Sequence, residues 1–203
     1  MKIICIGRNY VNHVAELGND IPNEPLFFLK PETAIQPKGH PFFIPYFSND
    51  IHYELELVLK INKNGKHIEE QFAHTYYSQI GLGIDFTARD IQEECKKNGH
   101  PWEKAKGFDG SAQVSQKFIN KNSLDLNNIS FKLKINQAVV QIGNSKDMIY
   151  SFDYIISYIS RFYTLRVGDL IFTGTPSGVG QVKIGDKLEG YIFEEKMLSV
   201  NIK

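Results

Sequence analysis

Alternating apolar and polar positions predict that β-strands form much of this chain. The alternation is clearest in residues 51–61 (IHYELELVLKI), which are expected to form one strand. One face of that strand carries Tyr53, Leu55, Leu57 and Leu59, and the other carries His52, Glu54, Glu56, Val58 and Lys60. Similar patterns predict strands at residues 3–6 and 78–86. Residues 129–144 are expected to form a hairpin that turns near Asn136.

Three segments have helical patterns, and the longest predicts a helix that covers the sheet. In residues 151–165 the apolar side chains fall on one helical face. This stripe consists of Phe152, Ile155, Ile156, Ile159 and Phe162. Residues 87–99 predict a helix with Thr87 as its cap, Asp90 three residues later and a glycine at its end. A brief helix is expected at residues 13–18, also ended by a glycine.

The expected strands outnumber the helices, so the patterns predict a β-rich α+β fold. Residues 167–193 add two β runs, each introduced by a Gly-Asp turn. The 203 residues contain no low-complexity segment, long repeat or linker, and we therefore expect a single domain over residues 1–203. Prolines alternate with aromatic residues before position 45, which favours a lid and extended loops in residues 1–45. Residues 46–203 are expected to form the core.

Composition excludes several classes of partner. Lys plus Arg and Asp plus Glu both number 23, so no net charge would draw the protein to nucleic acid or to an anionic membrane. The N-terminal apolar run is too short for a signal peptide or a spanning helix, which needs about 20 apolar residues. Cys5 and Cys95 match neither a redox pair nor a zinc spacing. We expect a cytoplasmic protein with reduced thiols that binds neither nucleic acid nor membrane.

The acidic residues of the clearest strand are candidates for a metal site. Glu54 and Glu56 are two positions apart, so their carboxylates project from one face of a strand. Asp85 follows another expected strand and could be a third oxygen ligand for a hard divalent cation. Alternation alone favours glutamates that simply face water on an amphipathic strand. His52 shares their face, but a hydrogen-bonded surface histidine is the simpler interpretation, and it is left out of the ligand set.

Eight collinear motifs resemble the fumarylacetoacetate hydrolase family, in its short single-domain branch. They are GRNYVNH followed by Glu16, FFLKP, HYELEL, GIDFTARDIQ, AKGFD, VVQIGNSKDM, RFYTLRVGDLIFTGTPSGVG and KIGDKLEG. Their order extends over nearly the whole chain, which makes an accidental match improbable. The resemblance implies a mixed β-sandwich roll with a few covering helices, assembled as a homodimer. Two segments near the pocket depart from the family: SAQVSQ after GFDG, and Phe86 with Thr87 after the aspartate.

The resemblance also implies the chemistry of the acidic residues. In the family, the glutamate pair and the aspartate bind Mg²⁺ or Mn²⁺, which here implies Glu54, Glu56 and Asp85, with Ca²⁺ as a further candidate cation. The substrates are small 2-oxo or β-diketo acids. The cation acts as a Lewis acid that polarises the oxo group and stabilises the developing enolate.

Further functional residues are carried over from the same motifs. His13 and Glu16 match a catalytic pair on a lid segment, and at this helical spacing the carboxylate can orient the imidazole. An exposed ion pair is the alternative. Lys106 in AKGFD matches a family lysine that neutralises a carboxylate or an oxyanion near the cation.

Five more residues are expected to bind substrate: Arg8, Lys30, Arg89, Gln92 and Thr175. Arg8 and Lys30 match the pocket wall. Arg89 and Gln92 are three apart and can face one cleft, although both could equally be solvent-facing helix residues. Thr175 lies in a TGTP turn whose backbone and hydroxyl can hold a substrate carboxylate, or it is an ordinary turn residue. This glycine-rich loop lacks the Gly-Lys-Ser/Thr ending of a phosphate loop, so nucleotide binding there is rejected.

Three functions remain open from the sequence. The leading one is a metal-dependent hydrolase or lyase that cleaves a C–C bond in an acylpyruvate, fumarylpyruvate or oxaloacetate type of acid. The second is an isomerase or tautomerase of an unsaturated oxo-diacid, which needs the same enolate but no attacking water. The third is a non-catalytic metal-binding protein. The presence of both His13 and Glu16 favours the first.

Overall fold

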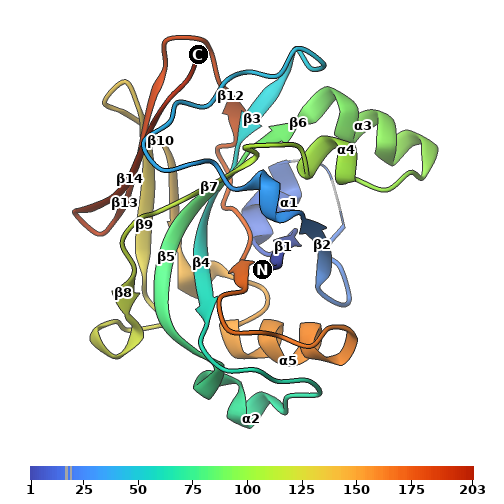
Figure 1. Cartoon of the computed structure of the whole chain (residues 1–203), viewed down its shortest axis with the longest axis vertical. Helices are drawn as coiled ribbons and strands as arrows, with labels where there is room; N and C mark the ends of the chain where they lie inside the picture. The colour runs from blue at the N-terminus through green and yellow to red at the C-terminus, as the bar shows by residue number, and fades with distance from the viewer. Residues whose placement is uncertain (17, 19) are drawn as a thin grey trace.

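Three β-sheets form the framework of the protein in the computed structural model, which describes residues 1–16, 18 and 20–203 (Figure 1). The strands are β1 (Ile3–Gly7), β2 (Leu26–Lys30), β3 (Ile51–Tyr53), β4 (Leu55–Ile61), β5 (Tyr77–Asp85), β6 (Thr87–Ala88), β7 (Ala112–Val114), β8 (Ile119–Asn120), β9 (Ser130–Ile135), β10 (Ala138–Asn144), β11 (Leu170–Phe172), β12 (Gly180–Gln181), β13 (Lys187–Ile192) and β14 (Glu195–Asn201). The helices are α1 (Val11–Glu16), α2 (Glu70–Ala73), α3 (Arg89–Asn98), α4 (Glu103–Lys106) and α5 (Phe152–Phe162), with 3-10 turns η1 (Glu32–Ala34), η2 (His74–Tyr76), η3 (Lys121–Ser123) and η4 (Ser145–Asp147). The predicted β-rich α+β class is confirmed.

The largest sheet has seven strands and includes the two strands of the N-terminal region. Its order is β2-β1-β11-β4-β5-β7, with β8 also paired to β5. Only the β1–β11 pair is parallel among the pairs that form this sheet in the described residues. A second sheet has the order β10-β9-β13-β14, and a third has the order β12-β3-β6. The first 45 residues therefore supply two strands of the main sheet in addition to α1 and extended loops.

The strand predicted over residues 51–61 is interrupted at Glu54. Before this residue, β3 pairs with β6 and β12; after it, β4 pairs with β5 and β11. The N–H of Asp85 donates to the carbonyl of Glu54 at 2.8 Å, which keeps the two chains adjacent through the break. Glu54 is therefore the point at which the chain passes from one sheet to another.

Two of the helices differ in detail from the patterns that predicted them. Helix α3 begins at Arg89 after Ala88, whose side chain makes no cap, and it ends at Gly99 in the left-handed conformation (φ 65°). The prediction that Thr87 caps this helix is wrong, because Thr87 pairs in β6 instead. Helix α1 begins at Val11, two residues before the predicted start. Leu17, which the prediction included, lies outside the described residues.

Helix α5 covers one end of the main sheet, as its apolar stripe predicted (Figure 1). The Ser151 hydroxyl caps it by accepting from the N–H of Tyr154 at 3.2 Å. Four of the five stripe residues are buried in the main core: Phe152, Ile155, Ile156 and Ile159. Phe162 lies in the last turn of the helix and is 54% exposed. The centre of its ring lies 5.5 Å from the centre of the Phe27 ring.

The predicted hairpin turn is confirmed between β9 and β10. Asn136 and Gln137 occupy it with positive φ values of 49° and 73°, the backbone that two-residue hairpin turns need. The ladder shifts register between Val139 and Gln141, so Val140 is an extra residue on β10. Beyond this bulge Gln141 is buried, with 1% of its surface exposed.

Apolar side chains cover both faces of the seven-stranded sheet. The main core includes Leu55, Leu57 and Leu59, the face of β4 that was predicted to be apolar. The opposite face has a smaller cluster, formed by Ile3, Cys5, Ala34, Val58, Ala112, Leu170 and Phe172. Both cysteines are buried and free. Within the described residues, no helix has the length and apolar character that a membrane crossing requires.

Candidate metal centre and active site

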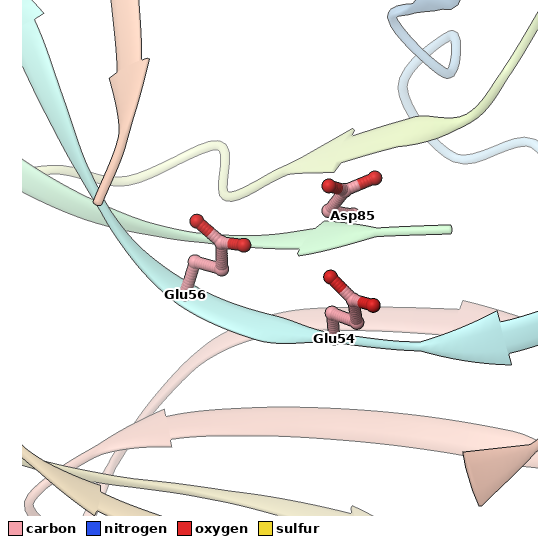
Figure 2. Close-up of side chains that lie close together, drawn as sticks. All are labelled: Glu54, Glu56 and Asp85. Atoms are coloured by element: carbon pink, nitrogen blue, oxygen red, sulfur yellow. The ribbon is translucent and has the colours of Figure 1, made fainter. Parts of the chain in front are cut away.

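Three carboxylates converge at the end of strands β4 and β5. Glu54 comes from the break before β4, Glu56 from β4 and Asp85 from the last position of β5. Figure 2 shows the three side chains on the same side of these neighbouring strands. One oxygen from each lies within 4.8 Å of the others. Their exposed fractions are 6%, 2% and 1%, so the alternative that the glutamates face water is wrong.

Three cationic side chains surround these acids. The Lys106 ammonium donates to Glu54 Oε2 at 2.8 Å, to Asp85 Oδ2 at 2.9 Å and to the Thr87 hydroxyl at 2.6 Å. Arg89 Nη2 donates to Glu54 Oε1 at 2.5 Å, and Lys30 Nζ lies 2.7 Å from Asp85 Oδ1. With all three carboxylates ionised, the formal charges of this group cancel.

The two glutamates have opposite pKa shifts because only one of them has cationic partners. Burial would raise the pKa of Glu54, but the charges of Lys106 and Arg89 outweigh it and hold that pKa well below its usual range. Burial raises the pKa of Glu56 well above 4.5, and the negative charges of Asp85 and Glu54 add to this rise. The N–H of Gly174 donates to Glu56 Oε2 at 2.7 Å, which opposes the shift only in part.

The acids fit a divalent cation. Glu56 makes no ion pair with any residue of the described chain, and its buried charge needs a positive neighbour. Asp85 Oδ1 is buried and accepts no hydrogen bond of acceptable geometry, although Lys30 Nζ is close enough for an ion pair. Three carboxylate oxygens form a hard donor set, which suits Mg²⁺, Mn²⁺ or Ca²⁺. A cation between them would neutralise Glu56 and use the orphaned oxygen of Asp85.

His13 and Glu16 form a pair on helix α1. His13 Nδ1 lies 3.1 Å from Glu16 Oε2, and His13 is 5% exposed. The other oxygen of Glu16 accepts from the N–H of Gly178 at 2.9 Å. His13 also lines the cavity that contains the three acids, so its imidazole and the candidate cation site share one space.

Of the five residues expected to bind substrate, four line this cavity: Arg8, Arg89, Gln92 and Thr175. Arg89 Nη1 donates to the Gln92 amide oxygen at 2.6 Å, so the two helix residues are joined and buried rather than solvent-facing. Lys30 is absent from the described cavity wall. Its ammonium is buried next to Asp85 and also donates to the carbonyls of Lys106 and Ser111.

The TGTP turn uses the Thr175 hydroxyl inside the protein. This hydroxyl donates to the Leu55 carbonyl at 2.9 Å and accepts from Gln141 Nε2 at 3.0 Å. A hydroxyl has a single proton to donate, so here it holds the turn against β4.

The three donors of Lys106 are likewise all bound to Glu54, Asp85 and Thr87, which makes Lys106 a partner of the protein carboxylates.

Gln141 is a residue that sequence reasoning missed. Its Oε1 accepts from the N–H of Leu55, the residue between the two glutamates, at 3.0 Å. Its Nε2 also donates to the carbonyl of Pro176 at 3.0 Å. One side chain from β10 thus fastens β4 to the turn over residues 174–178. The same turn donates one backbone N–H, that of Gly174, to Glu56 and another, that of Gly178, to Glu16.

Five more residues of the cavity wall were not predicted as site residues: Ile6, Gly7, Phe28, Lys96 and Trp102. Lys96 follows Arg89 by seven positions on α3, so helical periodicity could have placed it on the same face. The rings of Phe28 and Trp102 lie 6.0 Å apart in an edge arrangement. Phe28 lies in the FFLKP motif, whereas Trp102 lies in none of the motifs that carry the family resemblance.

Comparisons with known proteins agree on one family. Residues 2–200 match the family described as "Fumarylacetoacetate (FAA) hydrolase C-terminal". The chain is 44% identical over 192 residues to "Oxaloacetate tautomerase FAHD1, mitochondrial" of Bos taurus, covering 94% of this chain and 86% of that protein. It is 44% identical over 190 residues to "Oxaloacetate decarboxylase, mitochondrial" of Dictyostelium discoideum, covering 93% and 87%.

A solved structure is also similar over the whole chain. It is fumarylpyruvate hydrolase from Pseudomonas aeruginosa in complex with Mn²⁺ and pyruvate, with a TM-score of 0.92 and 35% sequence identity. The match covers 100% of this chain and 89% of that one. The three similar proteins therefore have names for three different reactions of small oxo-acids.

Proposed function

Because this chain belongs to the fumarylacetoacetate hydrolase family, we propose that it is a divalent-metal-dependent enzyme that enolises a small 2-oxo diacid of the oxaloacetate type. The observation that carries the proposal is the convergence of three buried carboxylates in one cavity with His13. The names of the Bos taurus and Dictyostelium discoideum relatives, a tautomerase and a decarboxylase of oxaloacetate, support this class of substrate.

Glu54, Glu56 and Asp85 would hold the cation, with Mg²⁺ or Mn²⁺ as the preferred ions. When bound, such a cation supplies Lewis acidity, which polarises the 2-oxo group and stabilises the negative charge that enolisation places on its oxygen. The surrounding charges favour a dianionic substrate. The charges of the three cationic side chains and of the three ionised carboxylates already cancel, so a bound cation adds a net positive charge that attracts the carboxylates of the diacid.

His13 would move the proton that enolisation requires. With Nδ1 donating to Glu16, the other ring nitrogen carries the lone pair that takes a proton from the carbon next to the oxo group. Glu16 orients the ring and stabilises its charged form after the transfer. Arg89, which already binds Glu54, keeps that carboxylate ionised and in place through the reaction.

Tautomerisation is the reaction we favour, with C–C cleavage as the second candidate. Return of the proton to the enolate oxygen gives the enol form, and return to the carbon gives the keto form, so no further reactant is needed. The name of the Bos taurus relative agrees with this reaction. Decarboxylation or hydrolysis would pass through a similar enolate. Hydrolysis would need His13 and Glu16 to activate a water molecule, and the Pseudomonas aeruginosa hydrolase supports keeping it as the second candidate.

The test compares the products that each reaction gives. Purified protein is stripped with a chelator, reloaded with Mg²⁺ or Mn²⁺, and mixed with oxaloacetate, an acylpyruvate or fumarylpyruvate. With oxaloacetate, tautomerisation changes the enol absorbance without producing pyruvate, whereas decarboxylation produces pyruvate. With the acylpyruvate or fumarylpyruvate, hydrolysis removes the diketo absorbance. If no acid reacts, or if chelation changes nothing, the proposed function is wrong.

We also propose that the enzyme works as a homodimer in the cytoplasm, as expected from the sequence and the family resemblance. The relatives from Bos taurus and Dictyostelium discoideum have names that place them in mitochondria. Light scattering of the purified protein would test the dimer, since a monomeric mass at micromolar concentration contradicts it. Fractionation of the source cells would test the location.

A further inference from the structure

The cavity wall carries more positive charge than the acids require. Arg8 and Lys96 both line the cavity, and neither forms an ion pair with any residue in the described part of the chain. They are additional to Lys106 and Arg89, which also line it and are paired with acids. Two of the cationic side chains that line the cavity are therefore left without an acidic partner among the described residues.

Arg89 adds an unused donor to this excess. Its two terminal nitrogens bind Glu54 and Gln92, but Nε is buried and has no hydrogen-bond partner among the described residues. The residue as a whole is 5% exposed. A buried guanidinium N–H without a partner is costly, which points to a ligand that completes it.

Lys96 is held in an environment that does not favour its own charge. Its ammonium lies 5.6 Å from the centre of the Trp102 ring, a weak attraction that fixes it at the wall. Burial and the positive charges of Arg89 and Arg8 lower the pKa of Lys96. An anion in the cavity would reduce this repulsion.

We infer that Lys96 and Arg8, with the free edge of Arg89, form a subsite for the second carboxylate of the substrate. The subsite makes the enzyme selective for dianionic over monoanionic 2-oxo acids, and Lys96 is its specificity-determining residue. This inference rests on the proposed function, because it assigns the distal end of the same oxo-acid. A competing explanation is that Lys96 is an ordinary surface lysine that rests on Trp102.

The test uses two acids of equal carbon number. Oxaloacetate has a carboxylate at its fourth carbon and 2-oxobutyrate has a methyl group there. Enolisation of both is followed as enzyme-dependent exchange of C3 hydrogen for deuterium, by NMR, with Mn²⁺ or Mg²⁺ present. Lys96→Gln should lower kcat/KM for oxaloacetate by about 10- to 100-fold, as expected for the loss of a hydrogen bond to a charged group, and leave 2-oxobutyrate unchanged.

Two variants provide the controls. Lys96→Arg keeps the charge and should preserve most of the preference for oxaloacetate. Lys97→Gln removes the same charge from the next, exposed position of α3 and should change neither acid. Thermal unfolding of each variant verifies that it is folded.

Binding of unreactive analogues gives a second readout. In calorimetry, Lys96→Gln should weaken binding of malate and leave 2-hydroxybutyrate unaffected. If Lys96→Gln changes both acids equally or neither, the subsite inference is wrong, while wild-type exchange activity leaves the proposed function standing. If the wild-type protein exchanges neither acid, both are wrong.

Discussion

The acidic centre and the His13–Glu16 pair face one cavity but are built in different ways. Glu56 and Asp85 belong to adjacent strands whose backbone ladder fixes their spacing. His13 and Glu16 belong to a six-residue helix that is fastened to the TGTP turn by one hydrogen bond, from Gly178 to Glu16. The candidate cation site is therefore preorganised by the sheet, whereas the pair proposed to transfer the proton is on an element with few attachments.

The size of the cavity gives this difference a consequence. Its volume is about 30 Å³, which is about twice the roughly 10–15 Å³ that a cavity needs, on the same measure, to hold one water molecule. An oxo-diacid needs more space than this, so part of the wall must move to admit it. Helix α1 is held by fewer contacts than the strands beneath the acids, and we expect the helix to be the part that moves.

The strongest way to break the comparison is to remove a cation ligand. Asp85→Asn or Glu56→Gln should weaken binding of Mg²⁺ or Mn²⁺ by more than about 100-fold, which exceeds the 10- to 100-fold typical of outer partners of a metal site. Activity should fall below detection, because the oxo group would no longer be polarised. Calorimetric titration with Mn²⁺ measures the affinity. Unchanged affinity in both variants would mean that these carboxylates do not hold the cation.

Removing the imidazole should separate the two regions. His13→Ala should lower kcat by about 10²- to 10⁴-fold, the usual contribution of a general acid or base, and leave cation affinity nearly unchanged. Glu16→Gln should have a smaller effect on kcat, because it changes the orientation of the ring without removing it. Turnover and Mn²⁺ titration are measured on the same samples. A parallel loss of cation affinity in His13→Ala would place the imidazole among the ligands.

Gln141 is the side chain that joins the two regions, and its removal should affect both. Gln141→Leu leaves the Leu55 N–H and the Pro176 carbonyl without their buried partner, at a cost of about 1–3 kcal/mol for each group left unsatisfied. The free energy of unfolding in urea should fall accordingly. Cation affinity and kcat should both fall, since the turn that binds Glu56 and Glu16 loses its support.

Gln113 provides the matched control for that change. It is also a buried glutamine, on β7, and its Oε1 has no hydrogen-bond partner in the described residues. Gln113→Leu should therefore be close to neutral for unfolding and should leave cation affinity and kcat unchanged. Equal effects of the two variants would show that Gln141 is an ordinary buried residue.

The smallest expected effect is a proton released when the cation binds. Because the pKa of Glu56 is raised well above 4.5 without a cation, the folded protein holds this proton at pH values where the unfolded chain has lost it. The contribution of Glu56 to stability is therefore present below pH 4.5 and is lost as the pH rises through the folded pKa. Cation binding requires the ionised form, so affinity should rise with pH over the same range.

Calorimetry in buffers of different ionisation enthalpy measures the released proton directly. Wild-type protein should release up to about one proton per cation at a pH below the folded pKa of Glu56. Glu56→Gln abolishes the group that releases it, and any residual cation binding should be independent of pH in this range. Proton release that persists in this variant would assign the shift to another group.

Local sequence patterns predicted the elements that carry the site. The alternation in residues 51–61 put Glu54 and Glu56 on one face, and the spacing of His13 and Glu16 brought them within hydrogen-bonding reach. The same reasoning could have found Lys96 from its position on α3. It could not distinguish buried glutamates from exposed ones, because both faces of a central strand can be covered.

Several residues have contacts that local reasoning misassigned. Thr87 has the chemistry of a helix cap, but pairing of β6 with β3 carries it to Lys106. Lys30, expected on the pocket wall, instead reaches Asp85 from β2, an edge strand four positions from β5 in the sheet order, and donates to the carbonyls of Lys106 and Ser111. These roles depend on which strands become neighbours, and that choice is made by the packing of the whole chain.

The sequence by itself determined the family, the β-rich class and the types of side chain available for chemistry, because periodicity and turn residues act over a few positions. Only the tertiary structure decided that Gly178 reaches Glu16 across 162 positions and that Gln141 reaches Leu55 across 86. It also decided that Glu56 is buried without a cationic partner while Glu54 has two. Contacts between distant segments and the electrostatics of burial arise only when the sheets assemble, so no local pattern encodes them.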